Sequence, residues 1–145
     1  MARNGFDKDG LAMPDPADLA ILTIAMPADT NPAGHIFGGW LMSQMDLAGA
    51  IHAGVRAKGA VATVAVDGFK FHAPVHVGDE VSCYTKIIRT GRTSMSITIE
   101  AWVRRSTVRT HVKVTSAVYH FVALDSEMKP RPLPEEDEAT HAEFD

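Results

Sequence analysis

The fold of this chain is decided by residues 36–56, which read IFGGWLMSQMDLAGAIHAGVR. Apolar residues surround most of the axis of an α-helix drawn through this segment, and a helix that is hydrophobic nearly all round is buried. At 1.5 Å per residue the helix is roughly 30 Å long. Glycines stand at its ends, with Gly38 and Gly39 at the start and Gly59 after it. The segment predicts one long, buried helix.

Five other segments read as β-strands: residues 19–26, 61–71, 80–90, 94–103 and 108–122. In residues 94–103 the apolar side chains alternate cleanly, from Met95 to Val103, so that one face of the strand is buried. In residues 108–122 the valines predict the same pattern, with Val118 and Val122 on the buried face. The Thr90-Gly91-Arg92 turn indicates a hairpin, and Ser106-Thr107 predicts a second tight connection.

The order of these elements is one strand, the helix, and then four strands that predict an antiparallel meander. A single long helix combined with a single curled antiparallel sheet requires the sheet to wrap around the helix. The sequence therefore predicts an α+β protein of the hotdog type. We expect the hotdog domain over residues 19–125. Residues 1–18 read as a flexible N-terminal segment, and residues 126–145 as a Pro-rich and then acidic tail.

Composition excludes several classes of protein. The 145 residues are 46% hydrophobic and 22% charged, which is the composition of one globular domain rather than of a disordered chain. A net charge of −4 argues against nucleic acid as a partner. No apolar run approaches the roughly 20 residues of a membrane span, and none resembles a signal peptide, so we expect a cytoplasmic protein.

Asp46 is the first candidate for chemistry. It stands in the middle of the most apolar part of the chain, where an ionised carboxylate without a partner is costly. Gly39, Ser43, Asp46 and Ala50 recur at helical spacing and share one small, polar face. This spacing fits a substrate-facing carboxylate and fits equally a structural Asp at a subunit contact.

Gly38 and Gly39 are the second candidate, because glycines at a helix N-terminus expose backbone N–H groups of the kind that form an oxyanion hole. The alternative is a tight entry into the helix. Asp29 and Asn31, just before them, read on spacing alone as turn or cap residues.

The third candidate is the turn Arg92-Thr93-Ser94, where an Arg and two hydroxyls can hold a phosphate, although such turns are more often only solvated. The histidines show no metal-ligand spacing, and no metal is expected. Cys83 lies among apolar residues and reads as a buried, unreactive thiol.

Three stretches of this sequence carry a resemblance to a known family: AMPADTNPAGHIFGGWLMSQMD (residues 25–46), KFHAPVHVGD (residues 70–79) and KPRPLP (residues 129–134). Together with the turn at residues 91–94, they closely resemble the bacterial YciA-type acyl-CoA thioesterases of the hotdog-fold acyl-CoA hydrolase family. The resemblance covers about residues 19–134.

The resemblance implies hydrolysis of acyl-CoA to a free acid and coenzyme A, with no cofactor. It implies that Asp46 is the catalytic carboxylate, as a general base or as a nucleophile that forms an anhydride. Asn31 matches an Asn that positions water and the thioester from the partner subunit. Gly38 and Gly39 match the oxyanion donors, and Arg92, Thr93 and Ser94 match the turn that approaches coenzyme A. The family also implies a homodimer with its sites at the interface, assembled as a trimer of dimers.

Two other functions stay open at this point. The first is a non-catalytic module that binds acyl-CoA, and such a module does not need Asp46. The second is a hotdog dehydratase acting on hydroxyacyl thioesters, which requires a His near the acid. His52 is six residues beyond Asp46 and points about 240° away around the helix.

Overall fold

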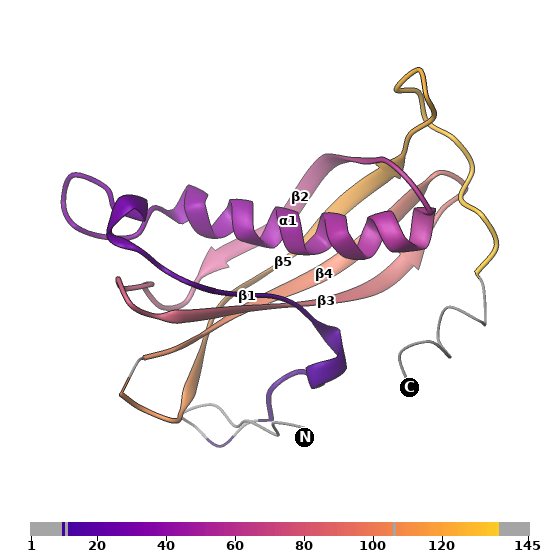
Figure 1. Cartoon of the computed structure of the whole chain (residues 1–145). Coiled ribbons are helices and arrows are strands. Elements are labelled where there is room, and N and C mark those ends of the chain that lie inside the picture. Colours follow the sequence, from indigo (N-terminus) through magenta and orange to yellow (C-terminus); the bar gives the residue numbers. More distant parts are fainter. Residues whose placement is uncertain (1–9, 11, 106, 137–145) are drawn as a thin grey trace.

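The computed structural model describes residues 10, 12–105 and 107–136. In Figure 1 the helix α1 (Gly38–Ala57) lies across one face of a five-stranded antiparallel sheet. The strands are β1 (Leu19–Ile24), β2 (Val61–Phe71), β3 (Glu80–Thr90), β4 (Ser94–Arg104) and β5 (His111–Ala123). The short 3-10 helices η1 (Pro16–Asp18) and η2 (Pro27–Asp29) flank β1. Because α1 contacts all five strands, the predicted hotdog architecture is confirmed.

The sheet order is β1-β3-β4-β5-β2, so the predicted four-strand meander is wrong for its first strand. β3, β4 and β5 do follow one another as neighbours, but β2 pairs with β5 and forms the sheet edge opposite β1. A hairpin between β2 and β3 would need a turn of a few residues. Residues 72–79 instead form a longer segment that crosses from one side of the sheet to the other.

The helix begins at Gly38, two residues later than expected, and ends at Ala57, where Lys58 adopts a left-handed conformation with φ 54°. Its sheet-facing side is buried and closely packed. A Cβ on Gly49 would lie 2.7 Å from side-chain atoms of Ile99 and of Phe121, so the glycine lets the helix approach the sheet.

The opposite side of α1 is open, and the expectation that the helix is buried all round is wrong for a single chain. Leu47, Ile51 and Val55 are 55%, 53% and 52% exposed. The physical reason is that a single sheet covers only one side of a helix.

The alternation predicted for β4 is confirmed, since the side chains of Met95, Ile97, Ile99, Ala101 and Val103 are at most 1% exposed. The face predicted for β5 is wrong in its second half. A bulge opposite Ala101 and Trp102 places Val114 and Thr115 both in the interior and shifts the alternation by one residue.

After this bulge the buried residues of β5 are Ala117, Tyr119, Phe121 and Ala123, while Val118 and Val122 are only half-buried. β5 also starts at His111 rather than at residue 108. Of the predicted tight connection, Ser106 lies outside the described residues.

The described part of the predicted C-terminal tail is anchored to the domain. Pro130, Pro132 and Pro134 alternate with Arg131 and Leu133, so only the latter two carry N–H groups. These N–H groups donate to the carbonyls of Ala123 and of Arg92, at 2.9 and 2.8 Å. Residues 129–134 thus form a strap across the end of the sheet; residues 137–145 lie outside the described chain, as do residues 1–9 and 11 of the N-terminal segment.

Candidate functional site

The loop that leads into α1 is organised by Asp29 and Asn31. The carboxylate of Asp29 accepts the N–H of Met26 at 3.0 Å. The side-chain oxygen of Asn31 accepts the N–H groups of Ala33 and His35, both at 3.0 Å. The interpretation of both residues as turn residues is therefore confirmed, and the loop they fix delivers the chain to the start of the helix.

The first turn of α1 presents backbone donors. The residue before it, Phe37, makes no side-chain capping bond, and Gly38 and Gly39 are both exposed. The first N–H groups of a helix have no partner within the helix and lie at the positive end of its dipole. A Cβ on Gly39 would meet nothing within 4 Å, so the space beside the Cα of Gly39 is open.

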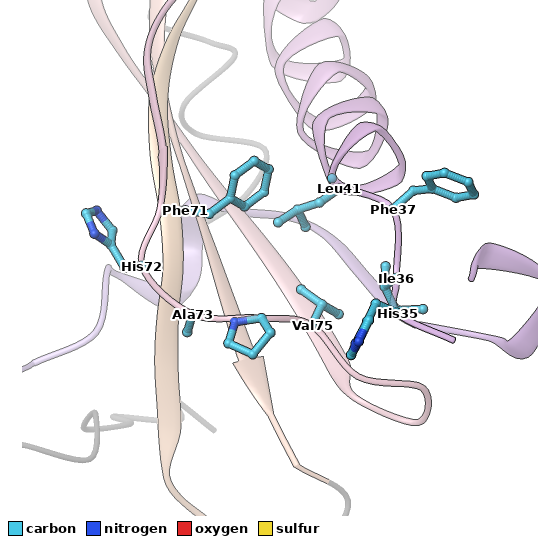
Figure 2. Close-up of a pocket in the computed structure, with 10 residues that line it drawn as sticks. His35, Ile36, Phe37, Leu41, Phe71, His72, Ala73 and Val75 are labelled. Carbon is cyan, nitrogen blue, oxygen red and sulfur yellow. The ribbon is translucent and has the colours of Figure 1, made fainter. Parts of the chain in front are cut away.

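A cavity of about 460 Å³ opens beside this turn. Figure 2 shows its walls: residues 35–38 on one side, residues 71–75 on the other, and Leu41 from the next turn of the helix. Gly38 is part of the wall, whereas Asn31, Gly39, Asp46 and residues 92–94 are not. The structure thus brings one of the predicted oxyanion donors to the cavity without the predicted carboxylate.

Asp46 is half-buried and points toward β2. Its Oδ1 accepts a hydrogen bond of 2.5 Å from Oγ1 of Thr63. The phenol of Tyr119 donates to the carbonyl of Met42 at 2.8 Å. In an α-helix that carbonyl also accepts the N–H of the residue four positions later, which here is Asp46. Residues of the sheet therefore hold both the side chain of Asp46 and the helix backbone that precedes it.

Burial raises the pKa of Tyr119, and the charges of Asp46 and Cys83 act in the same direction. The phenol consequently stays protonated and remains a donor to Met42. Thr63 could not be found from the sequence, because one Thr in an alternating strand is unremarkable and the contact joins residues 17 positions apart.

The turn at residues 92–94 lies at the other end of β2 from the cavity. Ser94 pairs with Val122 and Val122 with Ala62, near the start of β2, whereas Phe71 ends that strand. The turn is closed by the N–H of Gly91, which donates to the carbonyl of Ser94 at 2.8 Å. The Arg92 side chain is exposed.

His52 does not face Asp46. Its Nδ1 lies 3.0 Å from Oγ1 of Thr85 on β3, whereas Asp46 bonds to β2, and β4 and β5 lie between these two strands. Burial lowers the pKa of His52, against a smaller opposing effect of Asp18. Within the described residues, His52 and Asp46 therefore bond to different strands, and the pairing of His52 with Asp46 that a dehydratase would need is not formed.

Cys83 is fully buried, as expected, and burial raises the pKa of its thiol to about 12. Within the described residues, no group of three His, Cys, Asp or Glu side chains is placed to hold a metal ion. In the same part of the chain, no helix has the length and apolar character needed to cross a membrane.

Comparison with known proteins shows the family to which the chain belongs. The family model described as the thioesterase superfamily matches residues 33–110. The chain is 52% identical over 122 residues to the acyl-CoA thioester hydrolase YciA of Escherichia coli K12, an alignment that covers 82% of this chain and 92% of that protein.

Two solved structures are similar throughout. The hexameric broad-specificity acyl-coenzyme A thioesterase HI0827 superposes with a TM-score of 0.85 at 42% identity, over 95% of this chain and 94% of that one. The hexameric hotdog-fold thioesterase Cj0915 of Campylobacter jejuni superposes with a TM-score of 0.78 at 40% identity, over 86% and 96%. The chain described here belongs to the thioesterase superfamily, among the YciA-type acyl-CoA thioester hydrolases of the hotdog fold.

Proposed function

We propose that the protein hydrolyses acyl-CoA thioesters to a carboxylic acid and coenzyme A, in active sites shared between two copies of the chain. In this proposal Asp46 is the catalytic carboxylate of one copy. Gly38, Gly39 and Asn31 of the other copy bind the thioester. The observation that carries the proposal is a separation within one chain: Asp46 lies beside the start of β2, whereas Gly38 lies beside its end.

The separation is too large for one chain to act alone. Asp46 is eight residues after Gly38, which is about 12 Å along the helix axis. Thr63, the partner of Asp46, is eight residues before Phe71 at the cavity, which is roughly 25 Å along an extended strand. A carboxylate and an oxyanion donor that act on one thioester must both lie within a few ångströms of its carbonyl.

Antiparallel pairing of β2 with β2 of a second copy solves this problem. β2 is an edge strand of 11 residues, and most of its residues are exposed, Val64 at 60%. A long unpaired edge is a template for a further strand. Two-fold pairing places the Asp46–Thr63 end of one copy beside the cavity end of the other, and does so twice. We propose this homodimer as the unit of a trimer of dimers.

The chemistry needs few groups, because a thiolate is a good leaving group. Asp46 either removes a proton from the attacking water or attacks the carbonyl itself to give an anhydride that water then hydrolyses. The N–H groups of Gly38 and Gly39 stabilise the oxyanion that forms in either case. Arg92, Thr93 and Ser94 lie on the Asp46 side of the shared site, where we expect the phosphates of coenzyme A.

Mixed dimers test the shared site. Asp46→Asn removes the carboxylate, and Gly38→Pro removes one N–H at the first helical position, where proline is tolerated. Each variant alone should be nearly inactive. When the two are unfolded together and refolded, half of the dimers are mixed and each contains one intact site, so activity should recover to about a quarter of the wild-type level.

Refolding each variant separately is the control. Recovery only in the mixture supports the shared site, whereas no recovery in a mixture that forms dimers contradicts it.

We expect the protein to act in the cytoplasm, because a single buried thiol suits a reducing compartment.

A further inference from the structure

We propose that Asp67 meets the partner subunit's Asp67 at the two-fold axis of the dimer, and that His120 is the counter-charge that controls how tightly the two copies pair. The inference rests on the β2 pairing of the proposed function and adds a charged contact at its centre. Because each proposed active site needs both copies, a contact that controls pairing also controls how many sites are complete.

Symmetry places one residue of β2 opposite its own copy. When a strand pairs with itself about a two-fold axis, residues opposite each other share a face of the sheet, so the axis passes between a residue and the same residue of the partner. The proposed pairing brings Thr63 beside the partner's Phe71. Asp67 is midway between residues 63 and 71. The two Asp67 Cα atoms therefore come within about 4.5–5.5 Å of each other.

Asp67 lies on the outer face of the sheet, opposite the face that α1 covers. It pairs with Val118 of β5, whose neighbours Ala117 and Tyr119 are buried on the helix side. The Asp67 side chain is 74% exposed in a single chain. The register of β2 shifts on both sides of residues 65–67, and such bulges redirect side chains at sheet edges. The regular stretch between the two shifts thus presents one carboxylate at the edge where a second copy pairs.

A chain of hydrogen bonds fixes the His120 ring beside this carboxylate. Nε2 of His120 lies 2.8 Å from Oδ2 of Asp67, and Nδ1 lies 2.8 Å from Oγ of Ser96 on β4. A neutral ring donates from Nε2 and accepts the Ser96 hydroxyl, whereas a protonated ring donates from both nitrogens and Ser96 accepts. The ring keeps both contacts in either state, so only its charge changes.

The charge of the two rings decides whether the axis is repulsive. Carboxylates directly opposite each other destabilise an antiparallel pair. With both His120 rings neutral the axis carries two negative charges, and with both protonated each Asp67–His120 pair is neutral. The other charged side chains on this face of β2 to β5 include Lys70, Arg89 and the ion pair of Glu100 with Lys113.

The sign of the pH dependence follows from this arrangement. Among these residue types, only histidine ordinarily changes its charge between about pH 5 and pH 8. The partner's carboxylate favours the protonated ring, so a dimer binds more protons than two separate chains. The dimer should therefore tighten as the pH falls from about 8 to about 6 and loosen as the pH rises.

A cysteine at the axis tests the geometry. In Asp67→Cys the two new thiols face each other within disulfide range, so copper–phenanthroline should join chains of the full-length protein into covalent dimers. Ala65→Cys is the matched control on the same face, because its Cα would lie roughly 13 Å from that of its copy, too far for a disulfide. The wild type should not cross-link, since Cys83 is fully buried.

Cross-linking of Asp67→Cys and not of Ala65→Cys supports the axis. Cross-linking of Ala65→Cys, alone or equally with Asp67→Cys, would overturn the axis and leave the β2 pairing in place. An oligomer in which neither variant cross-links would overturn both. Cross-linking of Asp67→Cys, in a protein whose wild type hydrolyses no acyl-CoA, would overturn only the proposed hydrolase.

Subunit exchange tests the charge. Unlabelled and isotope-labelled protein are mixed, and native mass spectrometry follows assemblies with an odd number of labelled chains, which form only when a dimer opens. At about pH 6, His120→Gln should exchange about tenfold faster than the wild type, and added salt should reduce this difference. His120→Lys restores a positive charge and should exchange at about the wild-type rate.

The pH and a second substitution separate charge from packing. The wild-type exchange rate should rise about tenfold from about pH 6 to about pH 8, whereas neither His120 variant should show this rise. Asp67→Asn removes the repulsion, so His120→Gln should have little effect in that background. An equal effect of His120→Gln in both backgrounds, or a wild-type rate that is independent of pH, would overturn the role of His120 as counter-charge.

Discussion

Oγ1 of Thr63 donates a hydrogen bond of 2.5 Å to Oδ1 of Asp46, and this contact joins the middle of the helix to the start of β2. It fixes one carboxylate oxygen, while no hydrogen bond from the described residues holds the other. Asp46 is thereby oriented by a strand that follows the helix in sequence and that we propose as the dimer edge.

Thr63→Val removes this donor while keeping the shape of the side chain. Because hydrogen bonds to charged groups contribute about 1.5–3 kcal/mol, we expect kcat to fall roughly 10- to 100-fold, with a much smaller change in KM. Steady-state hydrolysis of acyl-CoA measures both constants. Thr63→Ser, which restores the hydroxyl, should recover most of kcat; a Ser variant as slow as the Val variant would show that Thr63 acts only through packing.

Arg131 should contribute strongly to stability although it lies in a segment that reads as a tail. Its guanidinium donates to the carbonyl of Ala57 at the helix C-terminus at 2.6 Å and to the carbonyl of Leu124 at 2.9 Å. Arg131→Met should lower the free energy of unfolding by about 2–3 kcal/mol in urea titrations. Lys129→Met, in the same strap at a side chain that is 72% exposed, is the control and should cost little; equal effects of the two changes would contradict the anchoring role.

His52 should make the protein less stable in mild acid. Burial lowers its pKa in the folded state, so the unfolded state binds more protons below the ordinary pKa of 6.5. The free energy of unfolding therefore falls as the pH drops through the window between 6.5 and the lowered pKa of the folded state. Urea titrations from about pH 7.5 to about pH 5.5 should show a shallower loss in His52→Gln. The exposed His76→Gln is the control, and an unchanged slope in His52→Gln would refute this account.

Cys83 should not react with thiol reagents in the native protein. Its side chain is fully buried and its pKa is raised to about 12, so almost no thiolate is present near neutral pH. An Ellman titration should detect no protein thiol until denaturant is added and one thiol per chain afterwards. Rapid reaction without denaturant would show that the strand around Cys83 opens.

Local patterns in the sequence were sufficient for most of the fold. The helix at residues 36–56 and the alternation from Met95 to Val103 depend on neighbouring residues only, and both are confirmed within two residues of their bounds. The errors arose where contacts between segments distant in sequence determine the structure. The bulge at Val114 and Thr115 depends on how β5 meets Trp102, and it reversed the predicted face of the valines that follow.

The candidate site shows the same division. Gly38, Asp29 and Asn31 act through residues within a few positions of themselves, so their turn and helix-start roles were visible in the sequence. Thr63 and Tyr119 reach Asp46 and Met42 only after the strands have folded back over the helix, and single residues of these types carry no signal. The role of Asn31 toward the thioester needs a second copy and the role of Arg92 needs bound coenzyme A, so both stay predictions.

Release of free thiol from acyl-CoA substrates of short, medium and long chain, with wild type beside Asp46→Asn, tests the central claim most directly. We expect turnover by the wild type and a loss of at least about 100-fold in the variant, because a general base usually contributes that factor or more. Unchanged melting and oligomeric state would show that the loss is chemical. Turnover by Asp46→Asn at the wild-type rate, or wild-type protein that binds every acyl-CoA and releases no thiol, would contradict it.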